Sequence, residues 1–320
     1  MKTKIFYVIV ILIFAMSSVG NAQTIGPLSA DSILRVNGEV YFKFALPDHI
    51  KLDTLTRIIS IDNVKDGEVF AYANTLEYER FLQLQIPITV LPSPGSLLND
   101  EELNMGNWQK NSDNMTIWNF YPTYTQYVTI MTGFASSYPS ICKLDTIGTT
   151  IQGRLLLALK ISDSVNYDRG APKVFLTSSI HGDEITGYVL MLHLIDTLLN
   201  AYGVSPRLTN MVNKTQIYIN PLANPDGTYR GGDASVSGAI RGNANTIDMN
   251  RNYPDPRAGQ HPDGNMWQPE VILFMNYAKQ QRFNLSINFH GGAEVVNYPW
   301  DTWNSSQKIT ADDSWWQFVS

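Results

Sequence analysis

The alternation of hydrophobic and polar positions divides the chain into two regions with different patterns. In residues 24–96, stretches with the two-residue period of strands are separated by stretches with the longer period of helices. The strand-like stretches are residues 38–46, 61–64, 67–74 and 86–92, and the helix-like stretches are 48–60 and 75–85. This βαββαβ order is typical of a ferredoxin-like unit, so we expect a small α/β domain here.

From about Tyr121 onward, longer helical patterns alternate with buried strands. The helical stretches are residues 123–139, 184–202 and 269–281, and the strand-like stretches are 141–150, 154–162, 173–180, 216–223 and 284–290. Strands that alternate with long helices indicate an α/β domain whose mixed, largely parallel central sheet carries helices on both faces. We place this domain at residues 119–320. Residues 97–118 lack periodicity and are rich in Pro, Ser, Asn and acidic residues, which predicts a linker.

The first 22 residues have the layout of a secretory signal peptide. Lys2 and Lys4 precede an apolar run that ends at Met16, and small residues lead to Ala22. We expect cleavage after Ala22, and therefore a secreted or periplasmic protein with no stable membrane span after cleavage. The alternative is an N-terminal membrane anchor, for which the apolar run is short.

Charge and cysteine content narrow the function classes. The 320 residues carry 29 acidic and 23 basic side chains, a formal net charge of −6, and no Lys/Arg-rich run. This pattern argues against nucleic acid as a partner. Cys142 is the only cysteine, so an intrachain disulfide is excluded. Its apolar neighbours indicate a core residue rather than the nucleophile of a thiol peptidase.

A polar group follows the strand-like stretch 173–180, where the sequence HGDE leads into a helix. Ligands of such sheets bind beyond the carboxyl ends of the strands. The H-x-x-E spacing places His181 and Glu184 about one helical turn apart, so both can reach one point. Catalytic zinc typically takes three protein ligands, and His290, at the end of another strand, supplies a third. The alternative is that these polar residues only cap the helix.

The stretch 238–256, GAIRGNANTIDMNRNYPDP, adds further polar residues in a loop-like segment. Two arginines and an asparagine, Arg241, Arg251 and Asn250, can form a bidentate clamp for a carboxylate. Asp248 can orient a metal-bound histidine through its other ring nitrogen. The alternative is an ordinary surface loop, but a zinc-ligand set and a carboxylate clamp make chemical sense together.

Four motifs share their order and approximate spacing with a known family. They are HGDE, NPLANPDG, RGNANTIDMNRNYPDP and NFHGGAEVVNYPWD. From about Tyr121 to its end, the chain resembles the zinc metallocarboxypeptidases of the A/B and N/E types, peptidase family M14. The wording of the third motif leans toward the N/E type. The resemblance implies the carboxypeptidase fold and a hydrolase that removes C-terminal residues from peptides or proteins through a metal-activated water, with a mild preference for Lys or Arg.

The resemblance also implies a role for each residue of the site. One Zn²⁺ ion per chain is implied, with the ligands His181, Glu184 and His290. The implied substrate contacts are Asn250 and Arg251 for the terminal carboxylate and Arg241 for the scissile carbonyl. Asp248 is implied as the support of His181 behind the metal.

In this family the general-base glutamate lies well beyond the third zinc ligand. Here about thirty residues follow His290, and Glu294, the one acid close behind it, does not match the family's motif. Residues 310–320, TADDSWWQFVS, begin a helical pattern that stops within about three turns. We therefore expect a chain that is truncated within the carboxypeptidase domain, a fragment of a longer enzyme, which lacks the base and shows little peptidase activity of its own.

Two other functions remain open. An amidohydrolase of the aspartoacylase type shares H-x-x-E and an N-R motif but acts on small acylated amino acids. A non-catalytic peptide-binding protein would keep the clamp without the base. Export, the two-domain layout and the segment from NPDG to RGNAN favour the carboxypeptidase over the amidohydrolase.

Residues 24–96 and the polar linker after them resemble the pro-segments of digestive procarboxypeptidases, which cover the active-site cleft. An accessory domain without an inhibitory role is the alternative.

Overall fold

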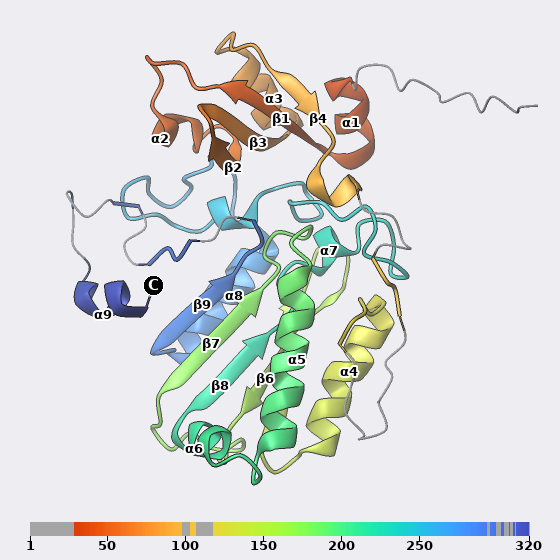
Figure 1. Ribbon diagram of the computed structural model, residues 1–320, viewed down its shortest axis with the longest axis vertical. Helices are drawn as coiled ribbons and strands as arrows, with labels where there is room; N and C mark the ends of the chain where they lie inside the picture. The colour runs from red at the N-terminus through yellow and green to blue at the C-terminus, as the bar shows by residue number, and fades with distance from the viewer. Residues whose placement is uncertain are drawn as a thin grey trace, which may run out of the picture.

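The computed structural model contains two β-sheets (Figure 1). The residues that the structure describes are 29–97, 103–106, 118–292, 295–298, 302–303, 307, 310 and 312–319. The predicted signal peptide, residues 1–22, lies outside them, as do Glu294 and most of the predicted linker 97–118. The boundaries of the two predicted domains therefore stay predictions.

The N-terminal sheet has four antiparallel strands in the order β2-β3-β1-β4. The elements of this region are α1 (Ala30–Asn37), β1 (Glu39–Ala45), α2 (Leu52–Leu55), β2 (Ser60–Lys65), β3 (Glu68–Asn74), α3 (Thr75–Leu82), β4 (Thr89–Leu91) and the 3-10 helix η1 (Pro94–Leu97). The predicted βαββαβ order is confirmed. α3 begins at a capping box, in which the side chains of Asn74 and Glu77 each accept the other residue's backbone N–H.

Two local features of this region differ from the prediction. The helix-like stretch 48–60 is helical only at α2, and turns follow before β2 begins. Its second half is rich in Thr and Ile, whose β-branched side chains lower helix propensity. The helix α1, which the pattern did not predict, ends at Asn37 and is capped by Gly38; the left-handed φ of 81° at Gly38 suits a helix terminus.

The C-terminal sheet has five strands in the order β5-β6-β8-β7-β9. They are β5 (Cys142–Thr149), β6 (Leu155–Ile161), β7 (Lys173–Ser178), β8 (Gln216–Asn220) and β9 (Leu285–Phe289). β7 pairs in parallel with β8 and with β9. β5 and β6, which correspond to the strand-like stretches 141–150 and 154–162, form an antiparallel hairpin, and β6 runs antiparallel to β8. The predicted mixed sheet is confirmed, and its parallel part is the β8-β7-β9 side.

Helices pack on both faces of this sheet. The helical segments are α4 (Tyr124–Ser137), α5 (Thr186–Ala201), α6 (Pro206–Lys214), α7 (Pro225–Thr228), the 3-10 helix η2 (Met249–Arg251), α8 (Pro269–Gln281) and α9 (Asp313–Val319). Alternate residues of β6 point to opposite faces. Leu157 and Leu159 belong to the core formed with α4 and α5, and Leu156 and Ala158 to the core formed with α8. Among the described residues, no helix combines the length and the hydropathy that a membrane span requires.

The N-terminal sheet lies against the end of the C-terminal sheet at which β7 and β9 terminate (Figure 1). Side chains of β1, β2 and β3 form hydrogen bonds with the segment between α7 and α8. Ligands of parallel strands bind beyond such carboxyl ends. The two sheets therefore meet where the sequence predicts the site.

Candidate metal centre

Close backbone packing shapes the turn that carries His181. β7 ends at Ser178, and the chain then passes through Ser179, which has a left-handed φ of 54°. A Cβ atom at Gly182 would lie 2.4 Å from the carbonyl carbon of Gly227, so backbone atoms exclude any larger residue there. The HGDE and NPDG motifs are therefore packed directly against each other, and this packing sets the position of His181.

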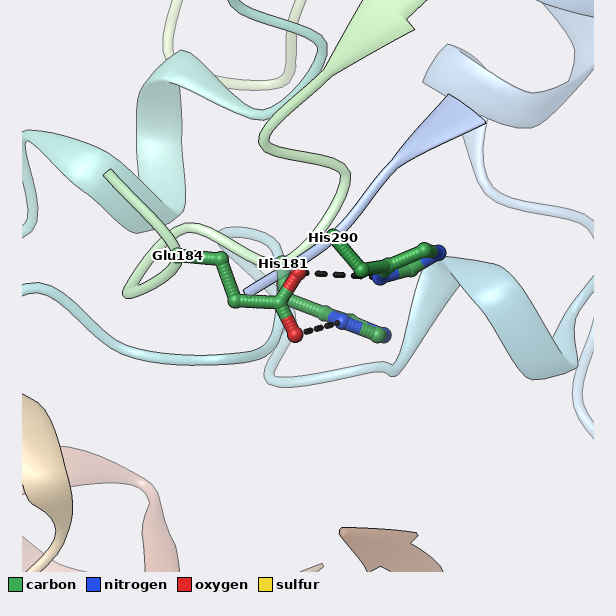
Figure 2. A group of neighbouring side chains, drawn as sticks. All are labelled: His181, Glu184 and His290. Atoms are coloured by element: carbon green, nitrogen blue, oxygen red, sulfur yellow. Dashed lines mark hydrogen bonds and ion pairs between the residues drawn. The ribbon is translucent and has the colours of Figure 1, made fainter. Parts of the chain in front are cut away.

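Three side chains converge beyond the ends of β7 and β9. The ligand atoms that His181, Glu184 and His290 offer all lie within 4.8 Å of one another. Glu184 stands between the two rings, with its Oε1 2.8 Å from Nδ1 of His181 and its Oε2 2.9 Å from Nδ1 of His290 (Figure 2). In the parallel pairing of β7 with β9, Ser178 lies opposite Phe289. This register brings His290 to the same edge of the sheet as His181.

The donor set fits a zinc ion. Two imidazole nitrogens and a carboxylate are ligands that catalytic zinc accepts, with a further position left for water or substrate. Burial raises the pKa of Glu184, but hydrogen bonds from both histidines outweigh burial and lower this pKa to about 2. The carboxylate is therefore ionised at neutral pH, as a metal ligand must be. The His290 side chain is 33% exposed, which leaves an approach to the site.

Asp248 holds His181 from behind. Its Oδ1 lies 3.0 Å from Nε2 of His181 and accepts the backbone N–H of Asn250, and its Oδ2 accepts from Nε of Arg241 at 3.1 Å. Burial raises the pKa of Asp248, but the charges of His181 and Arg241 hold it well below its usual range. When a metal ion takes Nδ1, the anion at Nε2 would accept the remaining ring proton of His181 and so keep the Nδ1 lone pair directed at the metal.

The three residues predicted to contact substrate lie in two places. Arg241 is 5% exposed, and its Nη1 lies 3.6 Å from Oε1 of Glu184. Asn250 and Arg251 instead line a cavity of about 390 Å³, together with residues of the α2 region. Nε of Arg251 is buried and has no hydrogen-bond partner among the described residues. The structure thus brings Arg241 to the ligand set, whereas Asn250 and Arg251 line a cavity whose lining residues do not include the three ligands.

The N-terminal sheet adds two residues to this network that the sequence pattern did not identify. The Glu39 carboxylate accepts the backbone N–H groups of Arg241 and Gly242, at 2.8 and 3.0 Å. The Ser60 hydroxyl donates to Asp248 and accepts from Nε of Arg241 at 2.7 Å. An acid at the start of an apolar strand was a weak signal for Glu39. No signal in the sequence distinguishes Ser60 from other serines.

Comparison with known proteins identifies the family. The family model described as zinc carboxypeptidase, Peptidase M14, matches residues 127–317. The chain belongs to the zinc carboxypeptidase family. The resemblance indicated by its motifs is therefore confirmed, while the role of each site residue stays a prediction.

Several curated carboxypeptidases match part of the chain. Carboxypeptidase D of Rattus norvegicus is 38% identical over 170 residues, which make up 52% of this chain and 12% of that protein. Carboxypeptidase M of Mus musculus is 36% identical over 195 residues, which make up 58% of this chain and 43% of that protein. The match thus spans less than half the length of either relative.

Solved structures share the fold. Thrombin activatable fibrinolysis inhibitor matches with a TM-score of 0.58 at 17% identity, over 88% of this chain and 78% of that chain. Carboxypeptidase A from Helicoverpa armigera matches with a TM-score of 0.56 at 17% identity, over 80% of this chain and 70% of that chain. At this level of identity, the likeness is one of fold alone.

The Glu39 carboxyl group links the stability of this arrangement to pH. Burial, together with the nearby charge of Asp183, raises its pKa from 4.5 to about 7. Between these two values, the folded chain binds a proton that the unfolded chain has lost. The contribution of Glu39 to the free energy of unfolding is therefore present below pH 4.5 and is lost as the pH rises through 7.

Glu39→Gln should remove this dependence, because the amide does not titrate. The loss of unfolding free energy between pH 4.5 and 8 should shrink by about 3 kcal/mol relative to the parent chain. Denaturant unfolding at the two pH values measures the difference, and Glu79→Gln, an exposed change on α3, is the control. The same pH dependence in Glu39→Gln and in the parent would contradict the link.

Proposed function

We propose that this chain is a secreted, zinc-dependent metallocarboxypeptidase that removes C-terminal residues from peptides or proteins. One observation carries the proposal: in a member of the zinc carboxypeptidase family, the ligand atoms of His181, Glu184 and His290 gather beyond the ends of two parallel strands. Secretion is proposed from the signal-peptide pattern of residues 1–22.

The residues of the site have separate chemical tasks. One zinc ion per chain, bound to the three ligands, supplies a Lewis acid that polarises a carbonyl and lowers the pKa of water. Arg241 directs its guanidinium at the ligand set and can donate to the scissile carbonyl oxygen as negative charge develops there. Asn250 and Arg251 can bind the terminal carboxylate, which restricts cleavage to the end of a peptide.

The reaction also needs a general base that takes a proton from the attacking water and passes it to the leaving amine. Among the described residues, Asp248 and Asp183 are two further acids beside the ligand set, and they already accept hydrogen bonds from His181 and Tyr72 respectively. Glu294 lies outside the described residues. We therefore assign the role of base to none of these acids.

The family match favours this reaction over the alternatives. The curated relatives are carboxypeptidases by name. An amidohydrolase of the aspartoacylase type would cleave small acylated amino acids and leave peptides intact. A non-catalytic homologue would bind peptide C-termini without turnover. A panel of peptides and acylated amino acids separates all three functions.

The purified chain should hold about one zinc ion, and His181→Ala should lose it, because too few protein donors remain. Metal analysis after dialysis checks this expectation. His193→Ala is the matched control, since His193 stacks on Trp118 along α5 and lies outside the ligand set. Equal zinc content in the parent and in His181→Ala would defeat the assignment.

In a full-length version of the enzyme, Arg251→Ala should reduce the cleavage of free-acid peptides by about one to two orders of magnitude, since a charge-assisted, bidentate contact contributes roughly 1.5–3 kcal/mol. Peptides with an amidated C-terminus should be poor substrates of the parent. Values of kcat/KM for matched acid and amide peptides measure both effects, with Arg257→Ala in the same segment as control. Comparable turnover of acid and amide would show that this is not an exopeptidase site.

We further propose that the N-terminal sheet covers the site in the manner of a pro-segment. β2 reaches both arginines that are predicted to contact substrate. The Ser60 hydroxyl accepts from Nε of Arg241, and the carbonyl oxygen of Ile61 accepts from Nη2 of Arg251 at 3.4 Å. Asp62 adds a carboxylate 3.9 Å from Nη1 of Arg241. This tripeptide thus contacts the groups that would hold the substrate.

A β-bulge accounts for the direction of these contacts. The register of β2 against β3 shifts between Ile61 and Asn63, so Asp62 is the extra residue. Bulges bend a strand and redirect its side chains, often beside active sites. Because Arg241 is almost fully buried under β2, a substrate carbonyl could not reach its guanidinium while the N-terminal sheet stays in this position.

In a full-length version of the enzyme, cleavage in the predicted linker near Lys110, followed by removal of the N-terminal fragment, should increase both peptide affinity and peptidase activity, because Arg241 and Arg251 become accessible. Limited proteolysis with separation of the fragments tests this, and cleaved protein from which the fragment has not been removed is the control. No change in either quantity after clean removal would favour an accessory role instead.

A further inference from the structure

The two histidines of the ligand set differ in the group that contacts Nε2, the ring nitrogen that faces away from Glu184. Nε2 of His181 faces the carboxylate of Asp248, whereas Nε2 of His290 lies 2.9 Å from the amide nitrogen Nδ2 of Asn288. The amide oxygen of Asn288 accepts in turn from the hydroxyl of Thr177 at 3.0 Å. A chain of hydrogen bonds therefore runs from Thr177 through Asn288 to His290.

The geometry of the strands places Thr177, Asn288 and His290 close enough to form this series of hydrogen bonds. Asn288 precedes His290 by two residues at the end of β9, so the two side chains lie on the same face. Thr177 on β7 is the Cα partner of Asn288 in the parallel pair. Neighbouring strands lie about 4.8 Å apart, so short polar side chains on each can form a direct hydrogen bond.

The direction of these hydrogen bonds decides which ring nitrogen of His290 carries the proton. While Nδ2 of Asn288 donates, Nε2 of His290 accepts, and the ring proton lies on Nδ1 facing Glu184. A metal ligand needs its lone pair at Nδ1, so the proton must then lie on Nε2 and be donated. Asn288 can accept it if its amide oxygen and nitrogen exchange places. Thr177 can follow, because a hydroxyl either donates or accepts, and no hydrogen bond is lost.

We propose that Thr177 and Asn288 are positioning residues, which orient the ring of His290 and adapt their hydrogen bonds to the tautomer that binds the metal. This inference rests on the proposed zinc site. Asp248 can only accept, so it selects one tautomer of His181. The amide of Asn288 accommodates both tautomers of His290, which makes His290 the adaptable ligand of the set.

Zinc affinity of the whole chain, measured by competition with a chromophoric chelator, tests the proposal without any assay of catalysis. Asn288→Leu removes both hydrogen bonds and should weaken binding by about 10–100-fold, as the loss of such a partner typically does. Asn288→Asp keeps an acceptor for the Nε2 proton and should retain the parent affinity. Thr177→Val loses the hydroxyl and should weaken binding by a smaller factor, whereas Thr177→Ser keeps the hydroxyl and should not.

The visible absorption of the chain loaded with Co²⁺ adds a readout of ligand geometry that a general loss of stability would leave unchanged. The bands should shift in Asn288→Leu and Thr177→Val and should match the parent in the two conservative variants. Thermal unfolding of the metal-free proteins checks the fold. The midpoint of thermal unfolding of each variant should stay close to that of the parent, because Asn288 is exposed and Val suits a strand as well as Thr does.

The outcomes separate this proposal from the metal centre on which it rests. Equal zinc affinity in the parent and in Asn288→Leu would overturn the positioning role and leave the metal centre intact. Equal losses in Asn288→Leu and Asn288→Asp would also overturn it, because an acceptor at this position would then have no effect. A parent chain that binds no zinc would overturn the metal centre and the positioning role together.

Discussion

The buried carboxylate of Asp248 is the group on which the rest of the site depends. One of its oxygens faces His181, and the other accepts from Arg241 and from Ser60. Leaving this carboxylate buried without its partners would cost several kcal/mol of folding free energy. The positions of His181, Arg241 and Ser60 are therefore constrained by Asp248 as strongly as its position is constrained by them. The proposed metal ligand His181, the guanidinium of Arg241 and the N-terminal sheet are thereby all held by a single side chain.

The charges around Arg241 also favour a metal ion in this site. Burial lowers the pKa of Arg241, but four carboxylates raise it above its usual range; they belong to Asp248, Asp183, Glu184 and Asp62. Arg241 alone does not neutralise four acids, and two of the other positive charges beside them belong to His181 and His290, which are themselves the proposed ligands of the metal. The remaining negative potential suits a divalent cation, which would be the largest local charge in the site. Burial, and after it the charge of Asp183, raises the pKa of Glu39 at the edge of this cluster, so Glu39 holds its proton to a higher pH than an isolated carboxyl group.

The parts of the site that lie within one motif could be predicted, and the parts that depend on contact between the two sheets could not. The i, i+3 spacing of His181 and Glu184 and the strand end before His290 predict that the three side chains converge. Ser60 lies 188 residues from Asp248, and its role arises from a bulge and from the placement of β2. Neither a bulge nor the docking of one sheet on another leaves a periodic pattern. The predicted helix 48–60 is longer than α2 for a related reason. The spacing of hydrophobic residues does not show which of them are β-branched and therefore disfavour a helix.

The parallel pairing of β7 with β9 also has a consequence for how the chain folds. Glu184 and His290 are separated by 106 residues, and they meet only when β9 has taken its place beside β7. A slip of a single residue in that pairing would turn His290 to the opposite face of the sheet, away from Glu184. A metal ion that needs both ligands would stabilise the correctly paired chain and leave the slipped one without benefit. The metal centre would therefore favour the correct register of β9 against β7 during folding, in addition to its part in the reaction.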